Sequence, residues 1–584
     1  MTSTLFVRLA GAALIAVGLV GPQPGFAQTP TQQELSRLAP LGAYLAARQA
    51  AGDRDRIAAA AYFRAALRTD PNNRVLIDAA FRALLMSGDI EEAVKFADRI
   101  VAFDKSDPRA RLVLGIRAIK QKQYQTARTN LAASYFSPPV TDLAAAVMAG
   151  WAAYGAGDAR IGVESIEKLG GEVWYALFKD MHAGLILELS GNKKEAGKRY
   201  ERANKLEIKD PRLTEAYVGW AARNGQKDEA IKAVEAIQQK LPRHPLINAL
   251  SDTVKRGERP AMIIGSPQEG SAEILYGLGS LISRGTGGGG EELGLIFLQL
   301  ALYLQPTHPM SLIALADLYS ATKKSELAIK LYDRVPANSP LRRNANIQLA
   351  IDLDTMERTE DARKLLDKLI AERPQDVDAI FALGNILRTR KKYPECAETY
   401  SKGIATISNA KQSDWTVFYF RGICFERARQ WDKAEGDLKK ALELSPDQPS
   451  VLNYLGYSWV DQGVNLDEGM RMIRRAVEQR PEDGYIIDSL GWAYYRLGQF
   501  EEAVKHLERA VELKPEDPTI NDHLGDVYWR VDRKHEAKFQ WSHAKDLKPE
   551  PEELPKIEEK LRNGLSNTPA SAAEVERKKT GSGG

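Results

Sequence analysis

The sequence predicts an all-α fold, a solenoid in which helical hairpins repeat along the chain, about fourteen of them in two arrays. Three observations support this prediction. A pattern of small and apolar residues recurs every 34 residues, a proline closes many of the repeats, and the helix-favouring residues alanine, leucine, glutamate, lysine and arginine are abundant. At 584 residues the chain is also far longer than one hydrophobic core requires, which suits an array that grows by repetition.

The first element is an export signal, which we place at residues 1–27. Arg8 precedes an uncharged apolar stretch at residues 9–20, and small residues follow it. The stretch is shorter than the roughly 20 residues that span a bilayer, so we expect cleavage between Ala27 and Gln28 rather than a retained anchor. The sequence therefore predicts a periplasmic protein whose mature form has no integral membrane span.

The repeats are clearest near the C-terminus. Residues 484–517 have Gly491 at position eight, Ala503 at position twenty and Pro515 at position thirty-two, and residues 518–551 repeat the pattern. Small residues are needed at positions eight and twenty because two antiparallel helices approach closely there. Proline ends the second helix because it has no N–H to donate. Each block is therefore expected to be a helix, a turn and a second helix.

This pattern resembles the tetratricopeptide repeat (TPR), and the same phase continues towards the N-terminus. After a short segment at 28–39, looser repeats form an N-terminal array at 40–246, and better ones form a C-terminal array at 272–551. Residues 247–271 break the period and are expected to be an irregular joint. Residues 552–565 are predicted to form a charged helix that caps the last repeat, and residues 566–584 a disordered tail.

The chain has two cysteines, Cys396 and Cys424. They fall at position twenty of one repeat and position ten of the next, so we interpret them as small core residues rather than as a redox pair. Because Cys396 is the first cysteine in the chain, a lipid-modified cysteine after the export signal is excluded.

The sequence indicates no catalytic function. Its seven histidines form no metal-ligand motif, so neither a metal nor a cofactor is expected. The glycine-rich stretch 285–290 lacks the Lys-Ser or Lys-Thr of a phosphate-binding loop and is expected to be a flexible insertion. Acidic and basic residues nearly cancel, leaving a net charge of +3, which argues against a nucleic-acid partner.

The candidate binding residues lie on the first helix of each hairpin, which lines the concave surface in TPR proteins. Exposed aromatic side chains with interleaved charges suit a peptide or protein partner. The candidates are Tyr419, Asn453, Tyr457, Tyr485, Asp488, Trp492, Tyr495, Arg496, Asp522, Asp526, Trp529 and Arg530. A clamp for a terminal carboxylate is disfavoured because positions five and nine of these repeats carry no Lys or Arg. The alternative is that Trp492 and Trp529 only pack between neighbouring repeats.

A more specific resemblance is carried by three runs, Asn453–Tyr457, Asp483–Trp492 and His523–Arg530. They are similar to the envelope TPR lipoproteins that act as adaptors of carboxyl-terminal processing proteases. The resemblance implies a scaffold that presents substrates such as cell-wall hydrolases to the protease, although this chain has no lipid-attachment cysteine. Two alternatives remain. One is a scaffold for exopolysaccharide secretion or outer-membrane assembly, and the other is an envelope enzyme or nucleotide-dependent regulator that uses the loop at 285–290.

Overall fold

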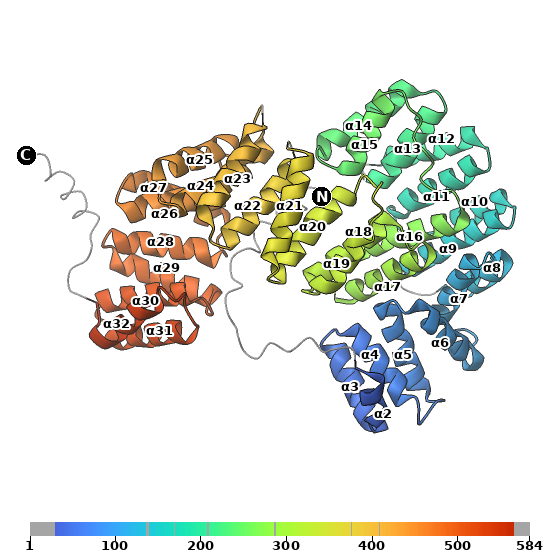
Figure 1. The fold of residues 1–584 in the computed structure, drawn as a ribbon, viewed down its shortest axis with the longest axis horizontal. Helices are drawn as coiled ribbons and strands as arrows, with labels where there is room; N and C mark the ends of the chain where they lie inside the picture. Colours follow the sequence, from blue (N-terminus) through green and yellow to red (C-terminus); the bar gives the residue numbers. More distant parts are fainter. Residues whose placement is uncertain are drawn as a thin grey trace, which may run out of the picture. The chain divides into compact units, whose positions relative to one another are not determined.

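The computed structural model of the protein is entirely helical in the part of the chain it describes, residues 30–135, 139–168, 170–206, 210–284, 288–374, 376–407 and 409–565 (Figure 1). Those residues form 31 α-helices and one short 3-10 helix, with no strand among them. The all-α prediction is confirmed. The predicted export signal at 1–27 and the tail at 566–584 lie outside the described residues.

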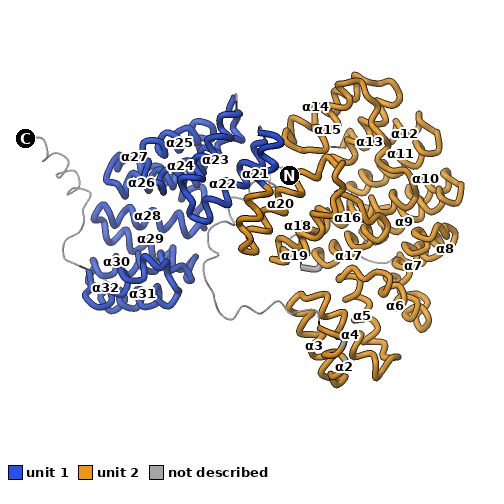
Figure 2. The backbone as a smooth tube through the Cα atoms, viewed as in Figure 1, with its two compact units in different colours: residues 1–20, 366–584 blue, residues 21–365 orange. Residues whose placement is uncertain are grey.

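The described residues divide into two compact units, one within residues 21–365 and the other within residues 366–584 (Figure 2). The first unit begins with α2 (Gln32–Arg37) and continues through six hairpins, then α15, then two further hairpins and α20. The hairpins are α3 (Pro40–Gly52) with α4 (Arg56–Ala66), α5 (Arg74–Ser87) with α6 (Ile90–Phe103), α7 (Pro108–Lys120) with α8 (Tyr124–Ala132), α9 (Pro139–Gly155) with α10 (Ala159–Glu167), α11 (Tyr175–Leu189) with α12 (Lys193–Asn204), and α13 (Pro211–Arg223) with α14 (Lys227–Lys240). They are followed by α15 (Pro245–Lys255), α16 (Pro267–Ile282), α17 (Gly288–Leu304), α18 (Pro309–Ala321), α19 (Ser325–Asp333) and α20 (Arg342–Thr355).

Helix α21 (Thr359–Glu372) spans the division between the units, and the second unit continues with five more hairpins. Their helices are α22 (Val377–Thr389), α23 (Tyr393–Ala405), α24 (Trp415–Arg427), α25 (Trp431–Leu444), α26 (Pro449–Gln462), α27 (Leu466–Gln479), α28 (Gly484–Arg496), α29 (Phe500–Leu513), α30 (Pro518–Arg530) and α31 (Lys534–Asp546). A short 3-10 helix, η1 (Gln412–Asp414), precedes α24, and α32 (Leu554–Asn563) ends the described chain.

One backbone feature marks the register of every repeat whose inner turn lies within the described residues. The residue at position fifteen, in the turn between the two helices of a hairpin, has a positive φ. It is Gly88, Gly157, Gly191, Gly225, Gly463 or Gly498 in some repeats and Arg54, Lys122, Lys323, Glu357, Lys391, Arg429 or Asp532 in the others. The left-handed conformation reverses the chain in a fixed number of residues. The 34-residue frame therefore holds in the N-terminal repeats, where the sequence match is looser.

Small residues hold the two helices of a hairpin together, as the repeat pattern predicts. A Cβ atom built on Gly456 of α26 would lie 2.7 Å from the carbonyl oxygen of Gly469 on α27. Such a contact leaves no room for a side chain. These two glycines occupy positions eight and twenty, the sites where the sequence predicts close helix approach.

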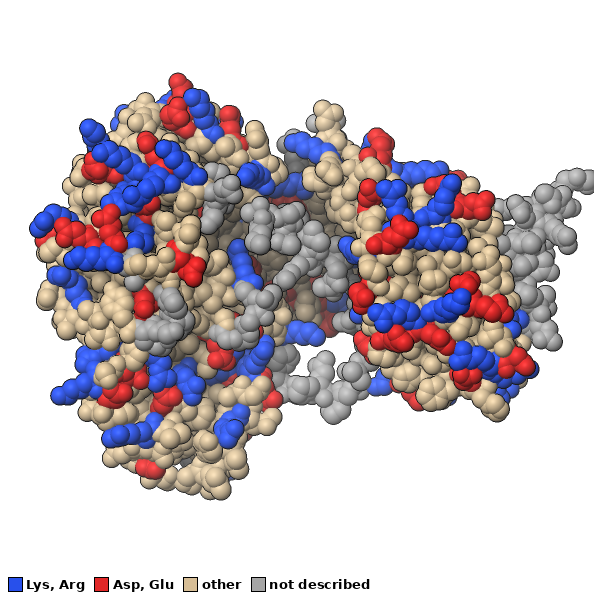
Figure 3. Space-filling model, turned by 180° about the vertical axis from the view of Figure 1, so that it is seen from behind, with Lys and Arg blue, Asp and Glu red and all other residues tan. Residues whose placement is uncertain are grey.

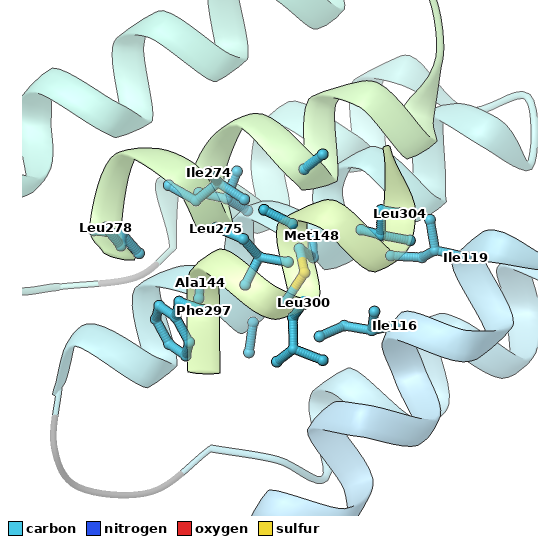
Figure 4. Packing of buried hydrophobic residues seen from close by; sticks show 14 of the residues in the cluster. Ile116, Ile119, Ala144, Met148, Ile274, Leu275, Leu278, Phe297, Leu300 and Leu304 are labelled. Atoms are coloured by element: carbon cyan, nitrogen blue, oxygen red, sulfur yellow. The ribbon is translucent and has the colours of Figure 1, made fainter. Parts of the chain in front are cut away.

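The first unit buries its core in a way that nearest-neighbour stacking does not predict. Helices α16 and α17 pack against α5, α7, α9 and α11, which are the first helices of four preceding hairpins. Leu300 and Leu304 of α17 share one apolar cluster with Ile116 and Ile119 of α7 (Figure 4). The inner faces of much of the N-terminal array are therefore covered by a hairpin of the same chain.

The segment 247–271 differs from the irregular joint expected from the sequence. Helix α15 extends to Lys255 and α16 begins at Pro267, so only residues 256–266 lie outside helices. The apolar cluster of the N-terminal repeats also includes α16 and α17, and the compact units divide at residues 365 and 366 instead. The reason is that α16 supplies apolar side chains to the array that precedes it.

The interpretation of the cysteines as unlinked core residues is wrong. Cys396 on α23 and Cys424 on α24 form a disulfide, with their Cα atoms 6.0 Å apart. Both side chains are fully buried, as expected. Position twenty of one repeat and position ten of the next face each other because the second helix of a hairpin packs on the first helix of its successor.

Candidate functional site

The twelve candidate residues, called here the inner-helix row, lie on α24, α26, α28 and α30, the first helices of four consecutive hairpins. They are less exposed than the sequence suggests. Asp488 and Asp526 are buried, at 8% and 5% exposure, and the other ten are half-buried. The row is therefore a set of side chains that support one another, and only parts of it face solvent.

Contacts between successive repeats link the row. Each joins residues 35 or 36 positions apart, so each connects one first helix to the next. The contacts are Asn453 Nδ2 to Ser489 Oγ at 3.1 Å, Arg496 Nη1 to Asp461 Oδ1 at 2.5 Å, and Arg530 Nε to the Tyr495 hydroxyl at 3.4 Å. Periodic cross-links of this kind fix the spacing between neighbouring first helices. Ser489 is not among the predicted candidates, although its repeat position places it beside the row.

An aromatic stack lies at the centre of the row. The indole of Trp492 stacks on the ring of Tyr495 with centroids 4.6 Å apart, and on the imidazole of His523 with centroids 4.0 Å apart. His523 also lies 2.9 Å, through Nδ1, from the Asp488 carboxylate. Burial alone would lower the pKa of His523, but the charge and hydrogen bond of Asp488 outweigh it and raise that pKa. The stack is thus held by an ion pair beneath it.

The C-terminal end of the row is closed by α32. Lys560 Nζ lies 2.8 Å from Asp522 Oδ2 and 2.7 Å from Asp526 Oδ1. Trp541 Nε1 also donates to Asp526, at 2.9 Å. Burial raises the pKa of Asp526 to about 6, against the opposing charge of Lys560. The two aspartates predicted to face a partner are therefore already paired within the chain.

Trp529 takes the alternative role considered in the sequence analysis. Its ring lies 5.4 Å from that of Trp541, centroid to centroid, and a Cβ on Gly564 would collide with it. It therefore packs between the last hairpin and the end of α32. Lys560 could have been found from the sequence, because it falls at position nine when the 34-residue frame is continued past residue 551, one repeat after Asp526.

The other end of the row carries three tyrosines. Tyr419 packs edge-on against Tyr454 with centroids 6.0 Å apart, and burial raises the pKa of Tyr419 to about 12. Burial, followed by the charge of Asp517, raises the pKa of Tyr485 to about 12 as well. Burial also raises the pKa of Tyr457. These phenols stay protonated at neutral pH, and because Tyr485 already donates to Asp517, the hydroxyls of Tyr419 and Tyr457 are the ones that can donate to a partner.

The strongest electrostatic cluster lies in the other unit and serves its structure. Arg212 of α13 binds Glu273 of α16 through two contacts, of 2.9 and 2.6 Å, and His308 lies 3.2 Å from the same carboxylate. Burial alone would raise the pKa of Glu273, but Arg212 and then His308 hold it well below its usual range. Nearby, burial lowers the pKa of His182 to about 4, and its Nδ1 accepts a hydrogen bond from Trp151.

Three further features of the described chain bear on function. Within the described ranges, no group of three or more His, Cys, Asp or Glu side chains is placed to hold a metal ion. The glycine-rich stretch 285–290 is described only from Gly288, where α17 begins, and residues 285–287 lie outside the described part. In that same described part, every helix is too short or too polar to cross a bilayer. On the face seen in Figure 3, acidic and basic side chains are interspersed over both units.

Comparison with known proteins identifies the repeats. A TPR repeat profile matches residues 491–532, and tetratricopeptide repeat profiles match residues 50–115 and 347–414. The TPR repeat-containing protein PA4667 of Pseudomonas aeruginosa is 26% identical over 147 residues, which is 25% of this chain and 24% of that protein. The BBSome complex member BBS4 of Bos taurus is 28% identical over 130 residues, which is 22% of this chain and 24% of that protein. The chain thus spans about a quarter of the length of these relatives.

Among solved structures, the APC/C hetero-tetramer Cut9–Hcn1 contains a chain that is 13% identical and aligns over 92% of this chain and 99% of that one, with a TM-score of 0.37. The profile matches fall inside the predicted arrays, and the helices of both arrays form successive hairpins on either side of α15. The prediction of a TPR solenoid is confirmed. Repeats of this kind indicate a scaffold for protein–protein interaction.

Proposed function

We propose that this protein is a non-enzymatic scaffold of the bacterial periplasm that binds a segment of a partner protein on the inner-helix row and brings it to an envelope protease. The observation that carries this proposal is the stack of Tyr495, Trp492 and His523. It is a rigid, half-exposed aromatic surface fixed by the buried Asp488. Aromatic anchors held in place before binding lose little entropy when a partner arrives.

Contacts within the chain already occupy the C-terminal part of the row, which leaves the rest of it for the partner. Lys560 already pairs with both Asp522 and Asp526, and Trp529 packs against the end of α32. The partner therefore contacts the stack and the tyrosines on the N-terminal side of it. A partner segment with hydrogen-bond acceptors and an apolar side chain suits protonated tyrosines beside an indole.

Two features support the periplasmic assignment. The first is the apolar N-terminal stretch with small residues at its end. The second is the Cys396–Cys424 disulfide, because such bonds persist in oxidising compartments and are rare in the cytosol. The test is cell fractionation with intact-mass measurement, and we expect a periplasmic chain that begins at Gln28 with both cysteines oxidised. A cytosolic chain that retains residues 1–27 would contradict the assignment.

The role as an adaptor is tested by affinity capture from an envelope extract, with mass spectrometry of the bound proteins. The parent chain is compared with Trp492→Ala and with Trp431→Ala, a matched control that removes a half-buried indole from α25, outside the row. Circular dichroism checks that both variants fold. We expect a carboxyl-terminal processing protease and cell-wall hydrolases to be captured by the parent and the control and lost with Trp492→Ala.

Two outcomes would contradict the proposal at different points. Equal capture by Trp492→Ala and the parent would mean that the stack is not the binding surface. Capture of secretion-channel or outer-membrane assembly proteins alone, without a protease, would replace the adaptor role with the export-scaffold role.

A further inference from the structure

A second candidate binding surface lies in the first unit, on helices α3 and α5. The first helices of the first two hairpins, α3 and α5, face each other across an open cleft of about 480 Å³. Tyr44, Phe63, Val75 and Ala79 give it apolar walls. Val75 is 71% exposed, and Leu41 and Leu45, on the same face of α3 as Tyr44, are 67% and 57% exposed. Large apolar side chains this exposed, gathered on one face, mark interaction surfaces.

The same face of α5 is already covered further along by the chain itself. Positions two, five and nine of this repeat, Val75, Asp78 and Arg82, line the cleft. Position thirteen is Met86, which packs against an apolar cluster that includes Leu295 and Leu298 of α17. In this array, therefore, an inner face is covered by a helix that presents apolar side chains to it. Helices α16 and α17 do this for α5, α7, α9 and α11, and the cleft is where that coverage stops.

The cleft has an excess of positive charge. Arg48, Arg74 and Arg82 line it, and all three are exposed. The one carboxylate in the lining, Asp78, lies 3.3 Å from Arg82 and 2.6 Å from Arg109 of the next repeat. Within the described residues, Arg48 and Arg74 have no carboxylate within ion-pair distance. Arg48 and Arg74 instead lie over aromatic rings, 6.0 Å from the centre of Tyr44 and 4.7 Å from the centre of Phe103.

Where the chain covers its own array, the charges have a consistent arrangement. The array supplies the cation and the covering hairpin supplies the carboxylate. Arg212 binds Glu273 of α16, Arg54 lies 3.4 Å from Glu291 of α17, and Arg56 lies 3.3 Å from Glu292 of α17. Arg48 and Arg74 of the cleft correspond to the cations of these pairs, but no covering hairpin of the described chain supplies a carboxylate to them.

We propose that the inner faces of α3 and α5 are a docking site for an acidic amphipathic helix of a partner protein. Apolar residues of that helix, spaced three and four apart, pack on Leu41, Leu45 and Val75. Glu or Asp residues beside them pair with Arg48, Arg74 and Arg82. The partner helix thereby covers α3 and α5 in the way that α16 and α17 cover the inner helices that follow. This site is separate from the inner-helix row and does not depend on the function proposed for it.

The test measures binding of two fluorescein-labelled probe peptides to the full-length chain by fluorescence anisotropy at low salt. Each peptide has about 18 residues, or five helical turns, with leucines spaced three and four apart. One carries glutamates on its polar positions, and the other carries lysines in their place. We expect saturable binding of the glutamate peptide, about tenfold or more tighter than the lysine peptide, and weakened by added salt.

Variants locate the binding. Arg48→Glu/Arg82→Glu and, separately, Val75→Asp change exposed side chains and leave the fold intact, which circular dichroism checks. Each is expected to weaken the glutamate peptide by about tenfold. Arg160→Glu, an 81% exposed arginine on α10, is the matched control and should bind like the parent.

Three results would overturn the proposal. The first is the absence of saturable binding by the glutamate peptide. The second is equal affinity for the parent and the double arginine variant, which would place binding elsewhere. The third is a concentration-dependent dimer, detected by light scattering and abolished by Val75→Asp, which would assign the cleft to a second copy of this chain.

Discussion

The imidazole of His523 stacks on the indole of Trp492 with ring centroids 4.0 Å apart and planes within 19°, and it does so across two repeats. The same imidazole is bound to Asp488, which lies one turn before Trp492 on α28. The stack therefore depends on two contacts that join α28 to α30. Loss of the ion pair releases the ring that supports the indole.

This arrangement predicts a pH dependence of stability that is specific to His523. Burial opposes the charged imidazole, but Asp488 raises its pKa above the usual value near 6.5. The proton is therefore held more tightly in the folded state, so its stabilising effect is complete below the unfolded pKa and is lost as the pH rises through the folded pKa. Denaturant unfolding of the parent and of His523→Gln at about pH 5.5 and about pH 8.5 should show a larger difference at the lower pH.

The control for that experiment is Asp488→Asn, which removes the partner and leaves the histidine. It should abolish or reverse the pH-dependent part of the difference, because the His523 pKa returns towards or below its usual value. A gap between the parent and His523→Gln that stays constant over this pH range would show that the ion pair has no role in stability.

The sequence predicts the fold well because its period is a packing constraint. Gly456 and Gly469 stand where two backbones touch, and no other residue fits there. It predicts the binding surface less well because exposure depends on what covers a helix. Asp526 occupies a position that faces a partner in TPR proteins, yet Lys560 of α32 covers it. The cleft between α3 and α5 is not predicted by the sequence for the same reason, since the repeat pattern does not indicate which inner helices α17 covers.

The cysteines show a second limit of the sequence. A thiol at position twenty and one at position ten each look like ordinary core residues within their own repeats. Their pairing appears only when α23 is packed against α24, which brings the two Cα atoms to 6.0 Å.

The disulfide leads to a prediction for the second unit. Reduction opens a loop of 28 residues and should lower the free energy of unfolding of this unit by about 2 to 4 kcal/mol. Urea unfolding with and without a phosphine reductant measures the change. In Cys396→Ala/Cys424→Ala the reductant should have no effect. A parent protein whose unfolding is also indifferent to reductant would contradict the prediction.

Removal of Arg212 should be among the most damaging single changes in the first unit. Arg212→Met leaves the Glu273 carboxylate buried without its main partner, which should lower the free energy of unfolding by about 3 to 5 kcal/mol. Urea unfolding of the parent and the variant gives the value.

Two further variants interpret that result. Arg212→Met/Glu273→Leu should recover part of the loss, because no uncompensated charge remains. Arg256→Met, which breaks an exposed pair with Glu258, should have no measurable effect. The explanation would be contradicted if Arg212→Met/Glu273→Leu lost more free energy of unfolding than the two single variants lose when their losses are added. The buried, uncompensated charge would then not be the cause of the loss.

The turn at position fifteen can be tested without disturbing any packing. Gly498 has φ +75°, and a Cβ placed on it has no atom within 4 Å. Gly498→Ala should therefore cost about 1 kcal/mol through backbone strain alone. Arg429→Gly, at the same position of another repeat with φ 61°, should stabilise by about 0.5 to 1 kcal/mol. Urea unfolding of the pair checks both signs, and two changes of the same sign would rule out the left-handed turn as their cause.

The hairpin of α16 and α17 also changes how the first unit acquires its structure. In an ordinary repeat array each unit touches only its neighbours, so truncation leaves the remaining repeats nearly as stable as before. Here Leu300 and Leu304 complete a core whose other walls begin at Ala47, more than two hundred residues earlier. The early repeats must therefore wait, during synthesis, for a segment that emerges much later. A chain that stops at residue 246 would leave that apolar interior facing water, as a ready target for chaperones and proteases.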